Sequence, residues 1–251
     1  MSNEGASQTL GAALRLRELI LGGEFRGGDR VSEQPLSARL GVSRTPLRLA
    51  FAQLEHEGLL EQIPGGGFVI SSFTIEQVVD AIDVRGLLEG AAARLAAERG
   101  ANTRELEAMH GCVSQLDRLF HPSRLTIDAF ERYVELNERF HSLLINLAGS
   151  DALEAAYARV MALPFASPSA FVILQAELPE SQRSLYVAQL QHRSVLEAIE
   201  NREGSRAEAL GREHARIARR NLNLVLSNER ALAVLPGASL IRLADGDEDV
   251  A

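Results

Sequence analysis

The chain has 251 residues, of which 46% are hydrophobic and 24% are charged, so it is long enough for one small and one medium domain with real cores. Its net charge of −8 does not by itself indicate a nucleic-acid partner. No apolar run approaches the roughly 20 residues of a membrane span, and the single cysteine, Cys112, excludes an intrachain disulfide and a thiolate metal cluster.

The N-terminal segment carries no targeting signal. Residues 1–8 are small and polar, with no basic region ahead of an apolar stretch, so they are no signal peptide and we expect them to be disordered. A partly apolar stripe at helical spacing then predicts a helix over residues 10–21, which Gly22 and Gly23 end. A cytoplasmic protein fits this pattern.

Two short helical patterns follow, on either side of a tight turn at residues 41–43. Gly41 suits the left-handed position that closes a first helix, and Ser43 suits the N-cap of a second because its hydroxyl can accept a free backbone N–H. Pro46 falls in the first turn, where its missing N–H costs little. The second helix has one apolar face, made by Leu47, Ala50, Phe51 and Leu54.

Polar side chains occupy the N-terminal end of this second helix. Arg44, Thr45 and Arg48 lie off its apolar face. Two helices joined by such a turn describe a helix-turn-helix, whose second helix enters the major groove, where Arg can make a bidentate contact to guanine. Residues 25–54 support this locally, because their five Arg outnumber two acids and give a net charge of +3. The alternative is a small helical core with a few surface arginines.

Two short apolar runs surround a glycine turn after Gly58. Residues 59–63 and 68–70 predict strands, and the Pro-Gly-Gly-Gly sequence at residues 64–67 predicts the turn between them. The pattern therefore predicts a β-hairpin wing after the helix-turn-helix.

The segment 41–48, with Gly28-Asp29-Arg30-Val31 before it and residues 54–59 after it, closely resembles the winged helix-turn-helix of GntR-family bacterial transcription regulators over about residues 10–72. The resemblance implies a homodimer that reads an inverted repeat in double-stranded DNA. Relatives often carry Arg or Lys near the wing tip, whereas Gly65 offers only backbone to a groove or a phosphate. The residues that we expect to contact DNA are Arg30, Arg39, Ser43, Arg44, Thr45, Arg48 and Gly65.

The character of the chain changes at Thr74, which with Gln77 resembles a capping box. Helical patterns then recur at residues 75–99, 103–120, 126–148, 151–163, 180–202 and 205–228. We therefore expect a mainly α protein. It would have a winged domain of three helices plus a hairpin at 9–72, an antiparallel all-α bundle of six or seven helices at 73–230, and a solvated tail at 231–251. Residues 165–177 are ambiguous and could hold a short extra helix.

Three histidines lie in the middle of predicted helices of the bundle. His141 follows Asn137 by one helical turn, so the two side chains share a face, and His192 and His214 lie on two other helices. They could converge three imidazoles and one amide oxygen on a divalent transition metal such as Zn, Ni or Mn. The residues alone leave equally open that these are satisfied core or surface histidines, as we expect for the other three.

Residues 74–230 resemble the all-helical FCD effector domain of the FadR subgroup of GntR regulators. Arg85 with Glu89 matches its opening helix, and the three histidines above match its metal-binding histidines. The resemblance implies a metal site at the floor of a cavity that binds a small carboxylate effector. We expect Arg85 to hold the effector carboxylate with its planar fork, and the alternative is a helix-surface ion pair with Glu89.

Asn137 departs from this family, which commonly has Asp at the position. Asn can bind a metal through its carbonyl oxygen but brings no charge, so the protein ligands would be neutral around a dication. We expect weaker binding of the bare metal and a larger contribution from an anionic effector.

Together these patterns predict a cytoplasmic, homodimeric, ligand-responsive transcription regulator. The resemblance implies that it represses transcription and that a small carboxylate relieves the repression. One alternative is a DNA-binding regulator whose helical domain is a metal-free dimerisation module. Another is a metal-dependent enzyme, in which an open metal position activates water. The sequence holds no HExxH motif and no carboxylate that stands out as a general base, which disfavours the enzyme.

Overall fold

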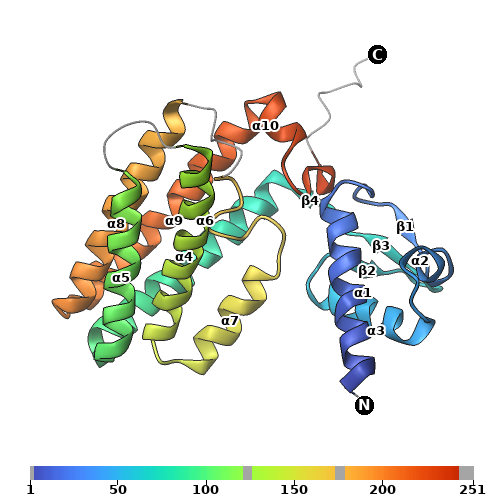
Figure 1. Ribbon diagram of the computed structural model, residues 1–251, viewed down its shortest axis with the longest axis horizontal. Coiled ribbons are helices and arrows are strands. Elements are labelled where there is room, and N and C mark those ends of the chain that lie inside the picture. Colours follow the sequence, from blue (N-terminus) through green and yellow to red (C-terminus); the bar gives the residue numbers. More distant parts are fainter. Residues whose placement is uncertain (1–2, 121–125, 173–178, 243–251) are drawn as a thin grey trace. The chain divides into compact units, whose positions relative to one another are not determined.

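The computed structural model describes residues 3–120, 126–172 and 179–242, and the chain divides into two compact units (Figure 1). The first unit holds the chain up to Val78, the short segment Ala162–Pro164 and the segment that begins at Pro236. The second unit holds Val79–Met161 and Phe165–Leu235. Within the described ranges, no helix has a stretch long and apolar enough to cross a bilayer.

The first unit is the predicted winged domain. It contains α1 (Asn3–Leu21), β1 (Arg30–Val31), α2 (Glu33–Leu40), α3 (Arg44–His56), β2 (Leu60–Gln62) and β3 (Phe68–Ile70). The strands form an antiparallel sheet in the order β1-β3-β2, and Val69 lies opposite both Arg30 and Glu61. The apolar face predicted for α3 is fully buried at Leu47, Ala50, Phe51 and Leu54.

Helix α1 begins at Asn3, so the prediction of a disordered N-terminus is wrong for residues 3–8, and residues 1–2 lie outside the described part. Adding a residue to a helix that has already formed costs far less than starting one. The partly apolar stripe of residues 10–21, which is buried at Ala12, Ala13, Leu16 and Ile20, therefore extends the helix backward through residues that have no apolar pattern of their own.

The turn between α2 and α3 has the geometry that the sequence predicts. Gly41 ends α2 in the left-handed region at φ +65°, and Ser43 begins α3 with an extended backbone. The Ser43 hydroxyl, however, makes no capping hydrogen bond, so that part of the prediction is wrong. At the wing tip Gly65, Gly66 and Gly67 all have φ near +90° to +105°, which side chains rarely tolerate and which explains the run of glycines.

The prediction of a solvated tail is wrong for residues 231–242. Ala231 and Leu235 are buried in the second unit, and the segment from Pro236 onward returns to the first unit. Its strand β5 (Ile241–Arg242) pairs in parallel with β4 (Phe73–Thr74). The Gly237 N–H donates to the Leu21 carbonyl at 2.7 Å, and Leu240 is fully buried. Residues 243–251 of the predicted tail lie outside the described part.

The second unit is the predicted helical bundle. Its described helices are α4 (Ile75–Arg99), α5 (Thr103–Leu119), α6 (Ile127–Leu147), α7 (Asp151–Met161), α8 (Pro179–Glu200), α9 (Gly204–Leu226) and α10 (Glu229–Ala233), with the first turn of α4 in the first unit. The capping box is confirmed, because Gln77 N–H donates to Thr74 Oγ1 at 3.3 Å and Thr74 N–H to Gln77 Oε1 at 2.9 Å. Residues 165–172 form turns rather than an extra helix, and 173–177 lie outside the described part.

Helices α4 and α9 pack closely because glycines face each other across their interface. A Cβ atom on Gly86 would lie 2.5 Å from the Ala215 Cβ, and one on Gly90 would lie 2.7 Å from the Arg212 Cγ. Real Cβ atoms essentially never approach that closely. This close approach brings the His214 region of α9 against the part of α4 that carries Arg85 and Glu89.

We expect Gly86→Ala to lower the free energy of unfolding. Overpacking costs about 1–3 kcal/mol, and the better helix propensity of Ala returns up to about 1 kcal/mol. The matched control is Gly111→Ala in α5, where a Cβ meets nothing within 4 Å, and which should raise the free energy of unfolding by about 0.5–1 kcal/mol. Urea unfolding of both variants measures the difference, and equal stabilisation by both would contradict the close packing.

Candidate functional site

Three helices of the second unit each place one histidine in the core. His141 lies on α6, His192 on α8 and His214 on α9, and their exposed fractions are 1%, 0% and 7%. On α6 the imidazole shares a buried stripe with Tyr133, Asn137 and other residues at helical spacing. The amphipathic pattern that folds the bundle therefore carries polar rings into its interior.

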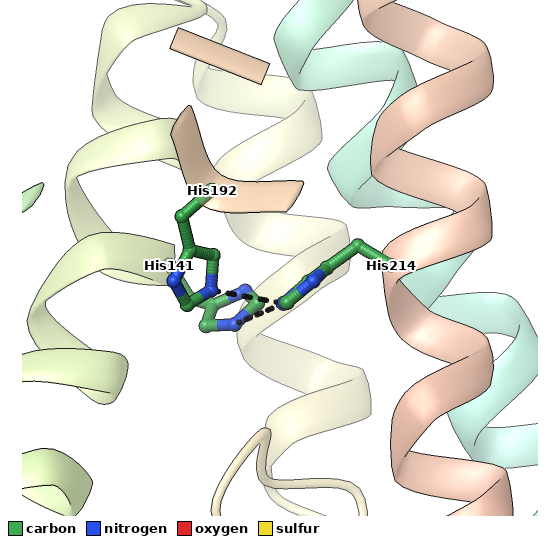
Figure 2. Close-up of side chains that lie close together, drawn as sticks. All are labelled: His141, His192 and His214. Atoms are coloured by element: carbon green, nitrogen blue, oxygen red, sulfur yellow. Dashed lines mark hydrogen bonds between the residues drawn. The ribbon is translucent and has the colours of Figure 1, made fainter. Parts of the chain in front are cut away.

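The three imidazoles face one another through the same ring nitrogen (Figure 2). Nε2 of His214 lies 3.0 Å from Nε2 of His192 and 3.4 Å from Nε2 of His141. All three ligand atoms lie within 4.8 Å of one another. The convergence that the sequence predicted for the histidines is thus present in the fold.

Each imidazole also has an oxygen atom beside its other nitrogen, Nδ1. The Nδ1 of His192 lies 3.0 Å from Gln189 Oε1, and that of His214 lies 3.2 Å from Gln191 Oε1. The Nδ1 of His141 lies 2.8 Å from Glu89 Oε1, although the ring N–H does not point straight at that oxygen. Histidines that bind metals commonly have such oxygen partners, which fix the tautomer and the orientation of the ring.

Burial keeps two of these rings, those of His192 and His214, in their neutral, metal-binding form. Burial and the two neighbouring imidazoles lower the pKa of His192 well below its usual value. For His214, burial and His141 lower the pKa to about 3, and the nearby Glu89 opposes this only in part. A neutral imidazole has a free lone pair, so these two side chains do not need to lose a proton before they bind a cation at neutral pH.

A buried ion pair lies beside the histidines on α4. Arg85 and Glu89 are each only 1% exposed, with the Arg85 Nε 3.5 Å from Glu89 Oε1. Burial raises the pKa of Glu89, but His141 and Arg85 outweigh it and lower the pKa to about 2. Arg85 also donates from Nη1 to the Ala166 carbonyl at 2.7 Å. The ion pair with Glu89 that the sequence left as an alternative is therefore present, but it lies inside the bundle rather than on the helix surface.

A small cavity of about 20 Å³ adjoins the histidines. Its polar lining residues are Arg85, Asn137, His141, His214 and Asn221. Asn137 donates from its amide nitrogen to the Ser169 hydroxyl at 3.2 Å. The cavity has room for about one water molecule, so a larger ligand requires some of its lining residues to shift.

The donor set fits a divalent transition metal. Two nitrogens bound tetrahedrally at about 2.0–2.1 Å from one ion lie about 3.3 Å apart, close to the 3.0 and 3.4 Å found between the Nε2 atoms. Without a cation or a proton, lone pairs that face each other at these distances would repel. His141, His192 and His214 could therefore hold a metal ion, and Asn137 lines the same cavity.

The residues predicted to contact DNA are all exposed on the first unit. They are Arg30, Arg39, Ser43, Arg44, Thr45, Arg48 and Gly65. Because the hydroxyl of Ser43 makes no capping bond, it remains available to a phosphate at the N-terminus of α3, which is a favourable place for an anion.

Two of these arginines have acidic partners that the sequence analysis missed. Arg48 donates from Nε to Glu33 Oε1 at 2.6 Å, and Arg39 forms an ion pair with Glu24. Exposed pairs of this kind contribute only about 0–1 kcal/mol. DNA phosphates can therefore replace these carboxylates at low cost.

The residues that orient the histidines were not predicted from the sequence. The pattern predicted Glu89 only as a partner for Arg85, and it predicted no role for Gln189 and Gln191. Glu89 had a detectable signal, because an acid at i+4 from an Arg in an alanine-rich helix is a candidate for burial. The glutamines had a weaker one, since Gln189 precedes His192 by three residues and so shares its helix face.

Comparison with known proteins agrees with both halves of the chain. The family model for bacterial regulatory proteins of the gntR family matches residues 8–70, and that for the FCD domain matches residues 80–216, more than half of the chain. The chain is 32% identical over 134 residues to the Bacillus subtilis HTH-type transcriptional regulator YdhC, which is 53% of this chain and 58% of that protein. It is 34% identical over 129 residues to the Nta operon transcriptional regulator of Aminobacter aminovorans. This match covers 51% of this chain and 58% of that protein.

These two matches span less than two thirds of each relative's length. A longer one, at 27% identity over 198 residues, covers 74% of this chain and 76% of the Escherichia coli HTH-type transcriptional repressor RspR. All three relatives are regulators rather than enzymes.

Two solved structures have the same fold. Lar, from work on the Listeria monocytogenes agr system, matches with a TM-score of 0.61 and 19% identity over 85% of this chain and 95% of that chain. E. coli McbR/YncC matches with a TM-score of 0.58 and 18% identity, over 88% of this chain and 97% of that chain. With a gntR-family domain followed by an FCD domain, the chain belongs to the GntR family of bacterial regulators, in the group that carries a C-terminal FCD domain.

Proposed function

We propose that this protein is a homodimeric, cytoplasmic transcription regulator, a repressor released from an inverted-repeat operator by a small carboxylate bound beside a metal ion. The observation that carries the ligand-responsive part is the convergence of three buried imidazole nitrogens next to a buried arginine. The observation that supports DNA reading is the exposed polar N-terminus of α3 in a winged domain.

Each half of the proposed effector site has a defined task. His141, His192 and His214 would hold the metal, with Asn137 as a further ligand, and a bound divalent cation supplies a Lewis acid for a carboxylate oxygen. Arg85 would hold the other end of the effector, because its planar fork matches a carboxylate. The effector therefore competes with the Ala166 carbonyl, to which Arg85 now donates.

This competition suggests how binding is transmitted. Releasing Ala166 from Arg85 frees the segment 165–172, which also covers Asn137 through Ser169. That segment continues from Ala162–Pro164, which belong to the first unit. An effector that favours one arrangement of this segment shifts the population of conformers and, through them, the affinity for DNA.

The DNA-binding half divides into positioning and reading. Arg44, Thr45 and Arg48 would contact base edges in the major groove. Contacts to phosphates would come from Arg30, Arg39, Ser43 and, through its backbone, Gly65. Two copies related by a twofold axis would read the two half-sites. The name of the relative RspR as a repressor agrees with this logic.

A second candidate keeps DNA binding but leaves the helical domain as a metal-free dimerisation module. Asn137 favours it, because the ligand set offered to a dication carries no charge. In that case a metal-loaded sample would not differ from a metal-free one in ligand binding or DNA affinity.

We expect Asn137→Asp to raise the affinity for a divalent metal, since a carboxylate adds a charged ligand where the native amide adds none. The measurement is competition with a colorimetric chelator at fixed pH, with the exposed Asn201→Asp as a charge-matched control. Unchanged affinity in Asn137→Asp would remove this position from the ligand set.

The proposed function is tested by three measurements on one preparation. Selection from random duplexes should recover an inverted repeat, and sedimentation equilibrium should give the mass of a dimer. A thermal-shift screen of small carboxylates against metal-loaded protein should then find acids that raise the melting temperature. Failure to select any recurring sequence would contradict the DNA-binding role, and a monomer mass would contradict the dimer.

A further inference from the structure

We infer that Gln189 is a positioning residue for the proposed metal site: it fixes His192 in the tautomer whose Nε2 lone pair faces the other two histidines. This inference rests on the proposed metal site and assigns a role to a residue outside the ligand set. It follows from four side chains that form a continuous hydrogen-bonded series.

The series begins at an anchored carboxylate on α5. Asp117 accepts from Arg193 Nε at 2.8 Å, and its second oxygen lies 2.7 Å from Arg193 Nη2. An ion-paired carboxylate can only accept hydrogen bonds. The group facing it from α8 must therefore be a donor.

That donor is the amide nitrogen of Gln189, which is 2% exposed. Its Nε2 donates to Asp117 Oδ1 at 2.6 Å and to the Val113 carbonyl at 3.1 Å. A carbonyl, like a carboxylate, has no proton to give. If the amide were turned over, its oxygen would face two acceptors and could bond to neither. These two neighbours therefore fix the orientation of the Gln189 amide.

With the amide nitrogen so fixed, the amide oxygen must face His192. Gln189 Oε1 lies 3.0 Å from His192 Nδ1. An amide oxygen accepts, so Nδ1 must carry the proton, and in a neutral imidazole Nε2 then carries the lone pair. That lone pair is 3.0 Å from Nε2 of His214, on the side where a cation would bind.

His214 lacks a partner fixed in this way. Gln191 Oε1 lies 3.2 Å from its Nδ1, but Gln191 is half-buried, and the contact to His214 is the one hydrogen bond described for its amide. In the metal-free protein Gln191 can turn over and donate to Nδ1, so that His214 carries its proton on Nε2 and donates it to His192 Nε2. Metal binding would then require His214 and Gln191 to change, whereas His192 and Gln189 are already set.

The replacement Gln189→Met removes the acceptor and keeps the length of the side chain. Without this acceptor, no hydrogen bond from residue 189 favours the His192 tautomer with its proton on Nδ1. In the other tautomer, the Nε2–H would point into the metal position. Changes to such orienting partners typically reduce metal affinity about 10–100-fold. Gln191→Met should reduce metal affinity less, because the Gln191 amide can turn over and so does not fix the tautomer of His214. Gln115→Met is the matched control, at a half-buried position of α5 whose amide bonds to the Gly111 carbonyl and to Arg132 rather than to a histidine.

Two readouts on the full chain test the inference. Long-range ¹⁵N–¹H NMR of the metal-free native protein, with His192→Gln to assign the signals, should show His192 protonated on Nδ1. In Gln189→Met that signal should move to the Nε2-protonated form or to a mixture. Titration with Co²⁺, followed by its visible absorption, should show weaker binding in the order native and Gln115→Met, then Gln191→Met, then Gln189→Met.

An Nε2-protonated His192 in the native protein would overturn the inference, and so would equal Co²⁺ affinity in native and Gln189→Met. If Gln189→Met does not fold, the native tautomer still decides. If the native protein binds no Co²⁺ at all, the proposed metal site fails. The tautomer measured without metal then judges the role of Gln189 separately.

Discussion

Replacing His214 with Ala should lower the affinity for a divalent transition metal more than a hundredfold. His214 lies closest to the centre of the cluster, since its Nε2 is within 3.4 Å of both other Nε2 atoms. A four-ligand zinc site is worth about 10–16 kcal/mol, so one ligand contributes roughly 3 kcal/mol, and each 1.4 kcal/mol is a factor of about ten. Titration of metal-free protein against a chelator of known affinity measures the loss.

His110→Ala is the matched control for this experiment. The His110 side chain is half-exposed, and its Nε2 lies 2.5 Å from Glu200 Oε1 rather than near the three clustered histidines. The His110→Ala variant should therefore bind metal as the native protein does. Equal loss in both variants would mean that the effect is not that of a lost ligand. Native protein that takes up no metal after loading would support the metal-free dimerisation module instead.

Replacing Arg48 with Ala should weaken operator binding by roughly 1–3 kcal/mol, or about 5- to 150-fold, if this guanidinium contacts a base. Arg48 is exposed in the first turns of α3, and its ion pair with Glu33 costs little to break. Fluorescence anisotropy on the selected operator, at one fixed salt concentration, measures the change.

Two further variants separate a base contact from general electrostatics. Glu33→Gln releases Arg48 from its partner and should bind DNA at least as tightly as the native protein. Arg206→Ala, at the exposed start of α9, removes the same charge from the second unit and should leave binding unchanged. Unchanged binding in Arg48→Ala would remove this residue from the interface. Equal weakening on operator and random DNA would assign it to a phosphate rather than a base.

Elements with strong local signals could be predicted from the sequence. Helices α4 to α9 begin and end within two residues of their predicted limits because Gly, Pro and capping residues punctuate them. Gly41 and the wing glycines likewise specify turns through their own backbone preference. The positions of the three histidines could also be predicted, because mid-helix positions in an amphipathic bundle restrict where a side chain can point.

What the sequence could not predict depends on contacts between distant segments. Strand β5 has two residues and pairs with β4, which lies far earlier in the chain at Phe73–Thr74, so no local periodicity marks it. The ion pairs of Arg39 and Arg48 join acids from preceding segments that a charge count treats only as a sum. Gln189 looks like an ordinary polar helix residue until the fold surrounds it with Val113, Asp117 and His192.

The central claim, that a ligand at the histidine cluster controls DNA binding, is tested most directly by operator affinity with and without an effector. The comparison uses native protein and the triple variant His141→Ala/His192→Ala/His214→Ala, with a carboxylate found by thermal shift. The native protein should lose about 5- to 150-fold in operator affinity when the acid is added. The triple variant should bind the operator without responding. A triple variant that responds to the same acid as strongly as the native protein would contradict the claim.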